Sequence, residues 1–156
     1  MSNHPSTEVH EAGSGRIIAV LGEQVQVRAR LAGTRLNIVD VTVPPGSGTP
    51  LHSHASTEIY RILSGRLQIS FQRGEKVSEV EAMAGDVVTM PAHAAHAYRN
   101  ASAEPAHFMA IVDDHMLAFF DEAASLQAPA GPPSPELVGR VMELTEAHGI
   151  AMMPPR

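Results

Sequence analysis

The sequence predicts an all-β domain of the sandwich or barrel class, followed by one or two α-helices. Short segments of alternating apolar and polar residues, bounded by glycine or proline, follow one another up to residue 113. Beyond that point the apolar residues recur with the period of an α-helix. We therefore expect a flexible leader over residues 1–14, a β-barrel over residues 15–113 and a helical extension over residues 114–156.

The first part of the β region contains three predicted strands, at residues 16–21, 23–31 and 34–43. In the second of these, Val25 and Val27 share one face and polar residues occupy the other, which is typical of a strand with one buried face. Pro44 and Gly46 should end the third strand, because proline cannot donate a hydrogen bond to a neighbouring strand and glycine allows a turn.

Five further strands are predicted at residues 66–72, 76–83, 87–91, 96–100 and 106–112. In the first of them Leu67, Ile69 and Phe71 should face inward, since every second residue of a strand points to the same side. Gly74 and Gly85 mark turns between these strands. Short strands and turns at this spacing favour a sandwich or barrel.

The first predicted helix covers residues 115–126. Asp114 should cap it, and Met116, Phe120 and Ala123 should form its apolar stripe.

Residues 127–135 are too rich in proline for a regular element and should form a linker. At its end, Ser134 should cap a second helix with Pro135 at the first helical position. This helix should run to His148 and stop at Gly149. Its apolar stripe is narrow, so we expect it to lie on the barrel surface or on a partner subunit.

Composition restricts the classes of function. The net charge is −6 and there is no basic run, which argues against a nucleic-acid partner. The absence of cysteine excludes disulfides, thiolate metal sites and cysteine nucleophiles. No apolar stretch approaches the roughly 18 residues of a membrane-spanning helix, and the first residues do not resemble a signal peptide. We expect one cytoplasmic domain that acts on a small molecule, without nucleic-acid or membrane partners.

Three histidines and one glutamate fall in two short blocks between residues 46 and 100. They are His52, His54, Glu58 and His96. Nitrogen and carboxylate groups of this kind compose many metal sites. His52 and His54 share a face in an extended chain, and they can converge with Glu58 only if the chain bends over residues 55–57. His96 would have to come from a neighbouring strand.

The two blocks resemble the two sequence motifs of the cupin superfamily, over about a third of the chain. The resemblance implies a cupin double-stranded β-helix, which is a jelly-roll barrel, with the one or two helices added at its C-terminal end. It also implies that His52, His54, Glu58 and His96 occupy the four metal-ligand positions.

One position departs from the cupin pattern. The second motif usually has proline, any residue and glycine, where this chain has Pro91, Ala92 and His93. The departure affects a turn rather than a ligand. Residues 36–50 and 115–124, which flank the motifs, also resemble single-domain, quercetin-dioxygenase-like cupins.

Three imidazoles and one carboxylate suit one divalent first-row ion per chain: iron, manganese, nickel, cobalt or zinc. Such an ion would retain two open positions for substrate oxygens or for dioxygen. The alternative is a cupin barrel that binds metal only structurally, or that has no catalytic activity.

Glu58, Tyr60 and Tyr98 are the candidate catalytic residues. By alternation from the neighbouring candidate ligands, both tyrosines point inward, where they could hydrogen-bond substrate oxygens or simply pack inside the barrel. Glu58 could also act as a base, by analogy with the quercetinase-like members. His93 and His107 are further acid–base candidates whose role is open.

The favoured function is a metal-dependent dioxygenase acting on a small oxygenated or aromatic compound, flavonol-like or enediol-like. Redox-neutral isomerase, cyclase or lyase chemistry is the first alternative, and non-catalytic binding of a small molecule is the second. Because a barrel of this kind has exposed sheet edges that need covering, we expect a homodimer.

Overall fold

The computed structural model describes residues 4–126 and 134–154. The strands are β1 (Ile17–Val20), β2 (Glu23–Arg30), β3 (Leu36–Val43), β4 (His52–Ser53), β5 (Glu58–Ser64), β6 (Arg66–Arg73), β7 (Lys76–Met83), β8 (Val87–Met90), β9 (His96–Arg99), β10 (Ala106–Asp113) and β11 (Ala151–Met152). The helices are α1 (Asp114–Ala123) and α2 (Pro135–Ala147). The eight strands predicted at residues 16–43 and 66–112 are confirmed, with ends that differ by at most two residues.

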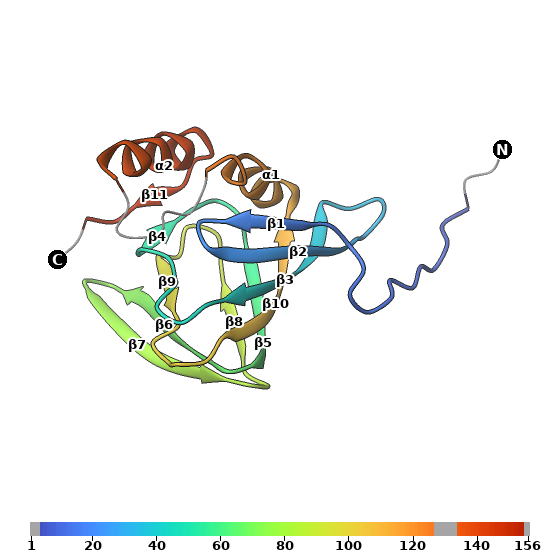
Figure 1. Cartoon of the computed structure of the whole chain (residues 1–156), viewed down its shortest axis with the longest axis horizontal. Helices are drawn as coiled ribbons and strands as arrows, with labels where there is room; N and C mark the ends of the chain where they lie inside the picture. Colours follow the sequence, from blue (N-terminus) through green and yellow to red (C-terminus); the bar gives the residue numbers. More distant parts are fainter. Residues whose placement is uncertain (1–3, 127–133, 155–156) are drawn as a thin grey trace.

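The strands form two antiparallel sheets that face each other and enclose the core (Figure 1). The first sheet has the strand order β1-β2-β3-β10-β5-β8, and the second has the order β11-β4-β9-β6-β7. Strands distant in the chain are hydrogen-bonded neighbours, as β3 and β10 are along their whole length. The predicted all-β jelly-roll architecture with two C-terminal helices is therefore confirmed.

The side chains between the sheets come from alternate positions of each strand. In β10, the buried residues are Ala106, Phe108, Ala110 and Val112, and the residues between them are half-buried on the outer face. The valines of β3 and Leu67 and Ile69 of β6 are buried in the same way. Full burial of a valine, leucine, isoleucine or phenylalanine side chain stabilises the fold by about 1.5–3 kcal/mol. The pattern of these apolar residues therefore decides which face of each strand points inward.

The cap of the first helix is Asp113 rather than Asp114. Asp113 has an extended backbone at the end of β10, and its Oδ1 accepts a hydrogen bond from the Met116 N–H at 2.9 Å. The prediction of Asp114 was wrong because that residue already belongs to the helix. Its carboxylate instead accepts hydrogen bonds from Asn37 and Arg30. The helix also ends at Ala123, three residues before the predicted end.

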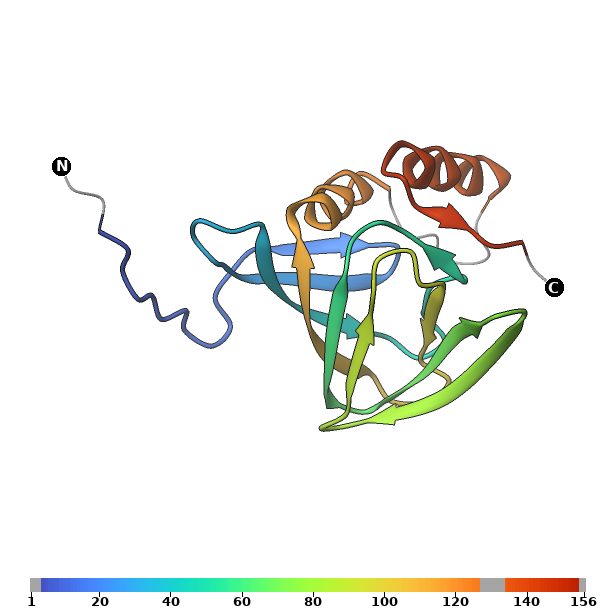
Figure 2. The same ribbon diagram turned by 180° about the vertical axis from the view of Figure 1, so that it is seen from behind.

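The second helix is confirmed with its predicted cap. The Ser134 hydroxyl accepts from the Leu137 N–H at 3.1 Å, Pro135 begins the helix, and Gly149 follows its end with a φ of 67°. The predicted linker lies, except for its last two residues, outside the described residues. Both helices sit together at one end of the barrel (Figure 2). Neither of these two described helices has the length and apolar character needed to cross a membrane.

After α2 the chain returns to the barrel and forms β11, a strand that the sequence analysis did not predict. Ala151 pairs with Ser53 and Met152 pairs with His52, so that β11 extends the second sheet beside β4. The Met153 N–H donates to the Leu51 carbonyl at 2.9 Å and continues this pairing. At the other end of the chain, residues 4–14 are exposed and contain no strand or helix.

Gly65 joins β5 to β6 at a place where no side chain fits. Its φ is 71°, and a Cβ atom there would lie 2.8 Å from the Pro105 carbonyl oxygen. Gly74, in the turn between β6 and β7, has a similar φ of 59° but open space around it. We expect Gly74→Ala to lower the free energy of unfolding by about 1–2 kcal/mol through the backbone alone. Gly65→Ala should cost about 1–3 kcal/mol more through the added clash.

Urea unfolding of the two variants, each against the wild type, measures the two costs. If both variants lose the same free energy of unfolding, the backbone near the Pro105 carbonyl moves aside for the added Cβ atom of Gly65→Ala without strain.

Candidate metal centre

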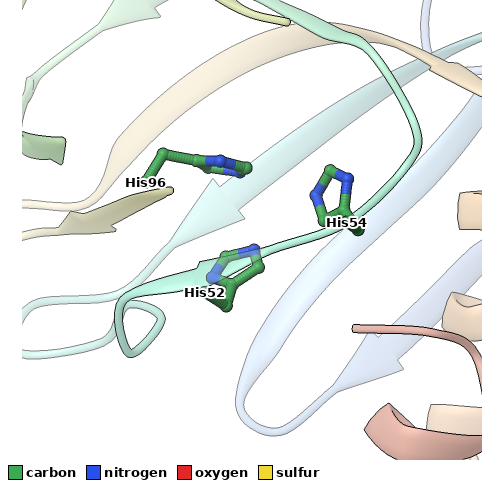
Figure 3. Close-up of side chains that lie close together, drawn as sticks. All are labelled: His52, His54 and His96. Atoms are coloured by element: carbon green, nitrogen blue, oxygen red, sulfur yellow. The ribbon is translucent and has the colours of Figure 1, made fainter. Parts of the chain in front are cut away.

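The three histidines of the two blocks meet at one end of the space between the sheets. His52 lies on β4 and His54 just after it, and His96 begins the neighbouring strand β9, directly opposite His52 in the register. The rings face a common region (Figure 3). The ring centroids of His52 and His96 are 4.5 Å apart, and those of His54 and His96 are 5.0 Å apart. One ring nitrogen from each histidine lies within 4.8 Å of those of the other two, a spacing that one metal ion can bridge.

Each imidazole is oriented by a hydrogen bond to the backbone. The Nδ1 atoms of His52, His54 and His96 lie 2.8, 2.9 and 2.9 Å from a carbonyl oxygen two residues away in the sequence. A carbonyl can only accept, so each Nδ1 carries a hydrogen atom. In the neutral ring the Nε2 atom then presents its lone pair to the shared region. Backbone bonds of this kind commonly orient metal-binding imidazoles.

Two of the Nε2 atoms lack a hydrogen-bond partner within the described parts of the chain. Those of His54 and His96 are both buried. A buried polar atom left unsatisfied costs about 1–3 kcal/mol, so such atoms persist where something else satisfies them. The donor set of three imidazoles therefore fits a divalent transition-metal ion.

Glu58, at the start of β5 in the opposite sheet, places its carboxylate beside two of the histidines. Its Oε2 atom lies 3.5 Å from His54 Nε2 and 3.3 Å from His96 Nε2. Burial alone would raise the pKa of Glu58, but the two imidazoles outweigh it and lower that pKa to about 2. Lone pairs of the carboxylate and of neutral imidazoles repel one another, so this arrangement needs a positive charge between them, either a proton or a metal ion.

The protonation of two histidines follows from the same surroundings. Burial lowers the pKa of His52 to about 4, which keeps this ring neutral and able to bind metal near pH 7. Burial also acts to lower the pKa of His54, but the adjacent Glu58 carboxylate outweighs it and raises that pKa. The structure thus brings the three predicted histidines within metal-binding distance. Ligation by Glu58 stays a prediction.

One family model matches part of this chain. The family model described as "Cupin domain" matches residues 39–112, which include both blocks. These residues, just under half of the chain, are similar to that family. The cluster of three histidines occurs where the resemblance of the two sequence blocks implied it. The closer resemblance to quercetin-dioxygenase-like cupins stays a prediction.

Solved structures show the same fold. The Cupin 2 conserved barrel domain protein from Salinispora arenicola CNS-205 has a TM-score of 0.55 at 20% identity, covering 79% of this chain and all of its own. The CENP-C cupin domain of Drosophila melanogaster has a TM-score of 0.58 at 14% identity, covering 70% of this chain and 84% of its own. A structure of the DMSP lyases RdDddP and RnDddQII has a TM-score of 0.50 at 21% identity, covering 59% of this chain and 47% of its own. At these identities the likeness concerns the fold alone. No curated protein sequence matches this chain.

The two candidate tyrosines point inward, as predicted. Tyr60 and Tyr98 are 6% and 8% exposed, and both rings contact Phe108. The Tyr60 hydroxyl donates to Glu58 Oε2 at 2.9 Å, so this tyrosine holds the carboxylate beside the histidines. Both tyrosines therefore pack inside the barrel and are also hydrogen-bonded. Contact of either hydroxyl with a substrate stays a prediction.

Sequence reasoning did not single out Glu23, whose carboxylate is also buried inside the barrel. It is 8% exposed, and the Tyr98 hydroxyl donates to its Oε2 atom at 2.6 Å. Burial raises the pKa of Glu23 to about 7, although the hydrogen bond from Tyr98 acts to lower it. The signal was present in the sequence, because Glu23 shares the inward face of its strand with Val25 and Val27.

The residue that departs from the second cupin motif adopts the backbone conformation of the missing glycine. His93 has a φ of 65°, and its N–H donates to the His54 carbonyl at 2.7 Å. The turn therefore has a left-handed residue, a conformation that favours glycine, and it ties the second block to the first. The His93 side chain is exposed. His107 lies on the outer face of β10 with its Nδ1 atom 3.1 Å from the Thr42 hydroxyl. These positions give no support to an acid–base role for either histidine.

Removal of one imidazole tests the candidate centre. We expect His96→Ala to lower metal affinity by at least about 100-fold, more than the loss of a supporting hydrogen bond usually does. The barrel should stay folded, because β9 remains paired with β4 and β6 through the backbone. Elemental analysis gives the metal content and circular dichroism checks the fold.

His93→Ala, which removes an exposed imidazole three residues earlier, is the matched control and should retain the metal. A full metal content in His96→Ala would contradict the assignment of this histidine.

Proposed function

We propose that this cupin domain holds one divalent first-row metal ion with His52, His54, His96 and Glu58, and that it is a dioxygenase. The substrate would be a small oxygenated or aromatic compound with two neighbouring oxygen atoms, such as an enediol or a flavonol. One observation carries the proposal: the buried Nε2 atoms of His54 and His96 lie 3.5 and 3.3 Å from the Glu58 carboxylate, an arrangement that needs a positive charge between them. When bound, the ion would act as a Lewis acid and as a template for the oxygen atoms of the substrate.

The side chains around the centre prepare it for an anionic substrate oxygen. The hydrogen bond from Tyr60 holds Glu58 in place, so the carboxylate does not have to reorient during turnover. Met90, which pairs with Glu58 across the sheet, and Phe108, whose ring contacts that of Tyr60, are 3% and 1% exposed and would keep this side of the centre apolar. Low local polarity strengthens each electrostatic contact made there.

Redox-neutral isomerase, cyclase or lyase chemistry is the second candidate, and one observation favours it. Two buried carboxylates, Glu58 and Glu23, are each hydrogen-bonded to a tyrosine. Paired acid and base groups of this kind suit proton transfer at a carbon next to a carbonyl, which needs no dioxygen.

The predicted homodimer and the cytoplasmic location remain proposals, which sedimentation analysis and cell fractionation would test.

Metal identity and oxygen uptake decide between the two candidates. We expect about one equivalent of iron, manganese, nickel or cobalt per chain by elemental analysis. An oxygen electrode should then show uptake that depends on an enediol or flavonol-like compound and is lost in His96→Ala. Tightly held zinc without oxygen uptake would favour the redox-neutral candidate. Failure to bind any of these ions after reconstitution would contradict both.

Tyr60→Phe tests the support of the carboxylate. The change removes the donor to Glu58 Oε2 and leaves the ring packing against Phe108 intact. Loss of such a supporting hydrogen bond typically lowers metal affinity or activity about 10–100-fold. Metal titration in the presence of a competing chelator measures the affinity. Unchanged affinity and turnover would leave Tyr60 with a packing role only.

A further inference from the structure

Glu23 is a buried carboxylate that the proposed metal centre does not use. It begins β2, on the inward face with Val25, and its described partner is the Tyr98 hydroxyl. The oxygen–oxygen distance of 2.6 Å lies at the short end of the range for hydrogen bonds between two oxygen atoms. β2 and β9 belong to opposite sheets, so the bond crosses the interior of the barrel.

Tyr98 is connected to the histidine centre through its strand and through Tyr60. Tyr98 follows His96 by two residues on β9, and its ring packs edge-on against that of Tyr60 with a centroid distance of 6.0 Å. The Tyr60 hydroxyl in turn donates to Glu58. Two hydrogen-bonded pairs, Tyr60 with Glu58 and Tyr98 with Glu23, therefore meet through the contact of the two tyrosine rings.

We propose that Glu23 is the proton donor of this site and acts through Tyr98 on an oxygen atom of the substrate bound at the histidine centre. This inference rests on the proposed function, because it needs a substrate at that centre. In the step, the phenol O–H bond of Tyr98 breaks as an O–H bond forms on the substrate oxygen. The Tyr98 hydroxyl, which donates to Glu23 in the structure, turns toward the substrate for this step, and the acid proton of Glu23 moves to the phenol oxygen as the phenol O–H bond breaks. Tyr98 ends neutral and Glu23 ends as a carboxylate, which solvent later reprotonates.

The surroundings of Glu23 favour its protonated form. Burial raises the pKa of this carboxyl to about 7. The titratable groups that interact with it are Tyr98 on β9 and, further away, Tyr60 on β5. Neither of these two carries a positive charge that would hold Glu23 ionised. An acid with a pKa near the pH of the cell is suited to give up and recover a proton in each cycle.

A purely structural role is the alternative, in which the bond to Tyr98 only fastens β2 to the opposite sheet. The variant Glu23→Gln separates the two roles, because glutamine retains an oxygen that accepts from Tyr98 but cannot hold or release the proton. Glu79→Gln, at an exposed position on β7, makes the same chemical change away from the core and is the matched control.

The first measurement is the infrared absorption of protonated carboxylic acids in the metal-free protein as a function of pH. We expect the wild type and Glu79→Gln to show a band that disappears with a midpoint near pH 7. The band should be absent from Glu23→Gln. Its presence in Glu23→Gln, or its absence from the wild type, would overturn the proposal.

The second measurement uses nitrocatechol, a coloured bidentate oxygen ligand, on the metal-loaded proteins. Above pH 7 the ratio of the dissociation constants of wild type and Glu23→Gln should change about tenfold per pH unit, as loss of one linked proton requires. Ionisation of the probe itself cancels in this ratio. Tyr98→Phe should remove the pH dependence in the same way, and it serves as the second variant if Glu23→Gln does not fold.

The outcomes distinguish the two proposals. If the wild type binds metal and nitrocatechol but the ratio is constant with pH, Glu23 is only structural and the proposed function stands. If the wild type binds no metal, the proposed function fails and this inference fails with it.

Discussion

Hydrogen bonds from three imidazole Nδ1 atoms to backbone carbonyls are the interaction on which the candidate centre depends. They turn the Nε2 lone pairs of His52, His54 and His96 toward one region, and the antiparallel pairing of β4 with β9 holds the rings there. Because the acceptors belong to the backbone near each histidine, the orientation is built into the strands and the adjoining loops. A metal ion entering such a site meets ligands that are already arranged, which lowers the entropic cost of binding.

The two buried glutamates show how the barrel gives the same side chain two different properties. Glu58 lies against two imidazoles, which lower its pKa to about 2. Glu23 has a phenol as its described neighbour, and burial raises its pKa to about 7. The two tyrosines lie between them with their rings in contact. Environments that separate the pKa values of two carboxyls are typical of sites that use one as a base and the other as an acid.

Much of the fold was predictable because its signals are local. Alternation identified the strands, and Ser134 with Pro135 identified the start of α2. The cap of α1 was placed one residue too late, because two consecutive aspartates offer the same chemistry and only the extended backbone at Asp113 distinguishes them. The strand β11 was missed because two residues carry no detectable period, and its partner lies about a hundred residues earlier in the chain.

The sequence by itself determined the class of the fold, the spacing of the four candidate ligands and the turn that His93 occupies, because these depend on residue type and on neighbours a few positions away. Only the tertiary structure decided that Glu58 contacts two of the histidines, that Asp114 bonds to Asn37 instead of capping α1, and that Glu23 reaches Tyr98. Those contacts join strands of opposite sheets or residues far apart in the chain. The physical reason is that a side-chain contact depends on how two elements pack, and packing is set by the whole core and not by either local pattern.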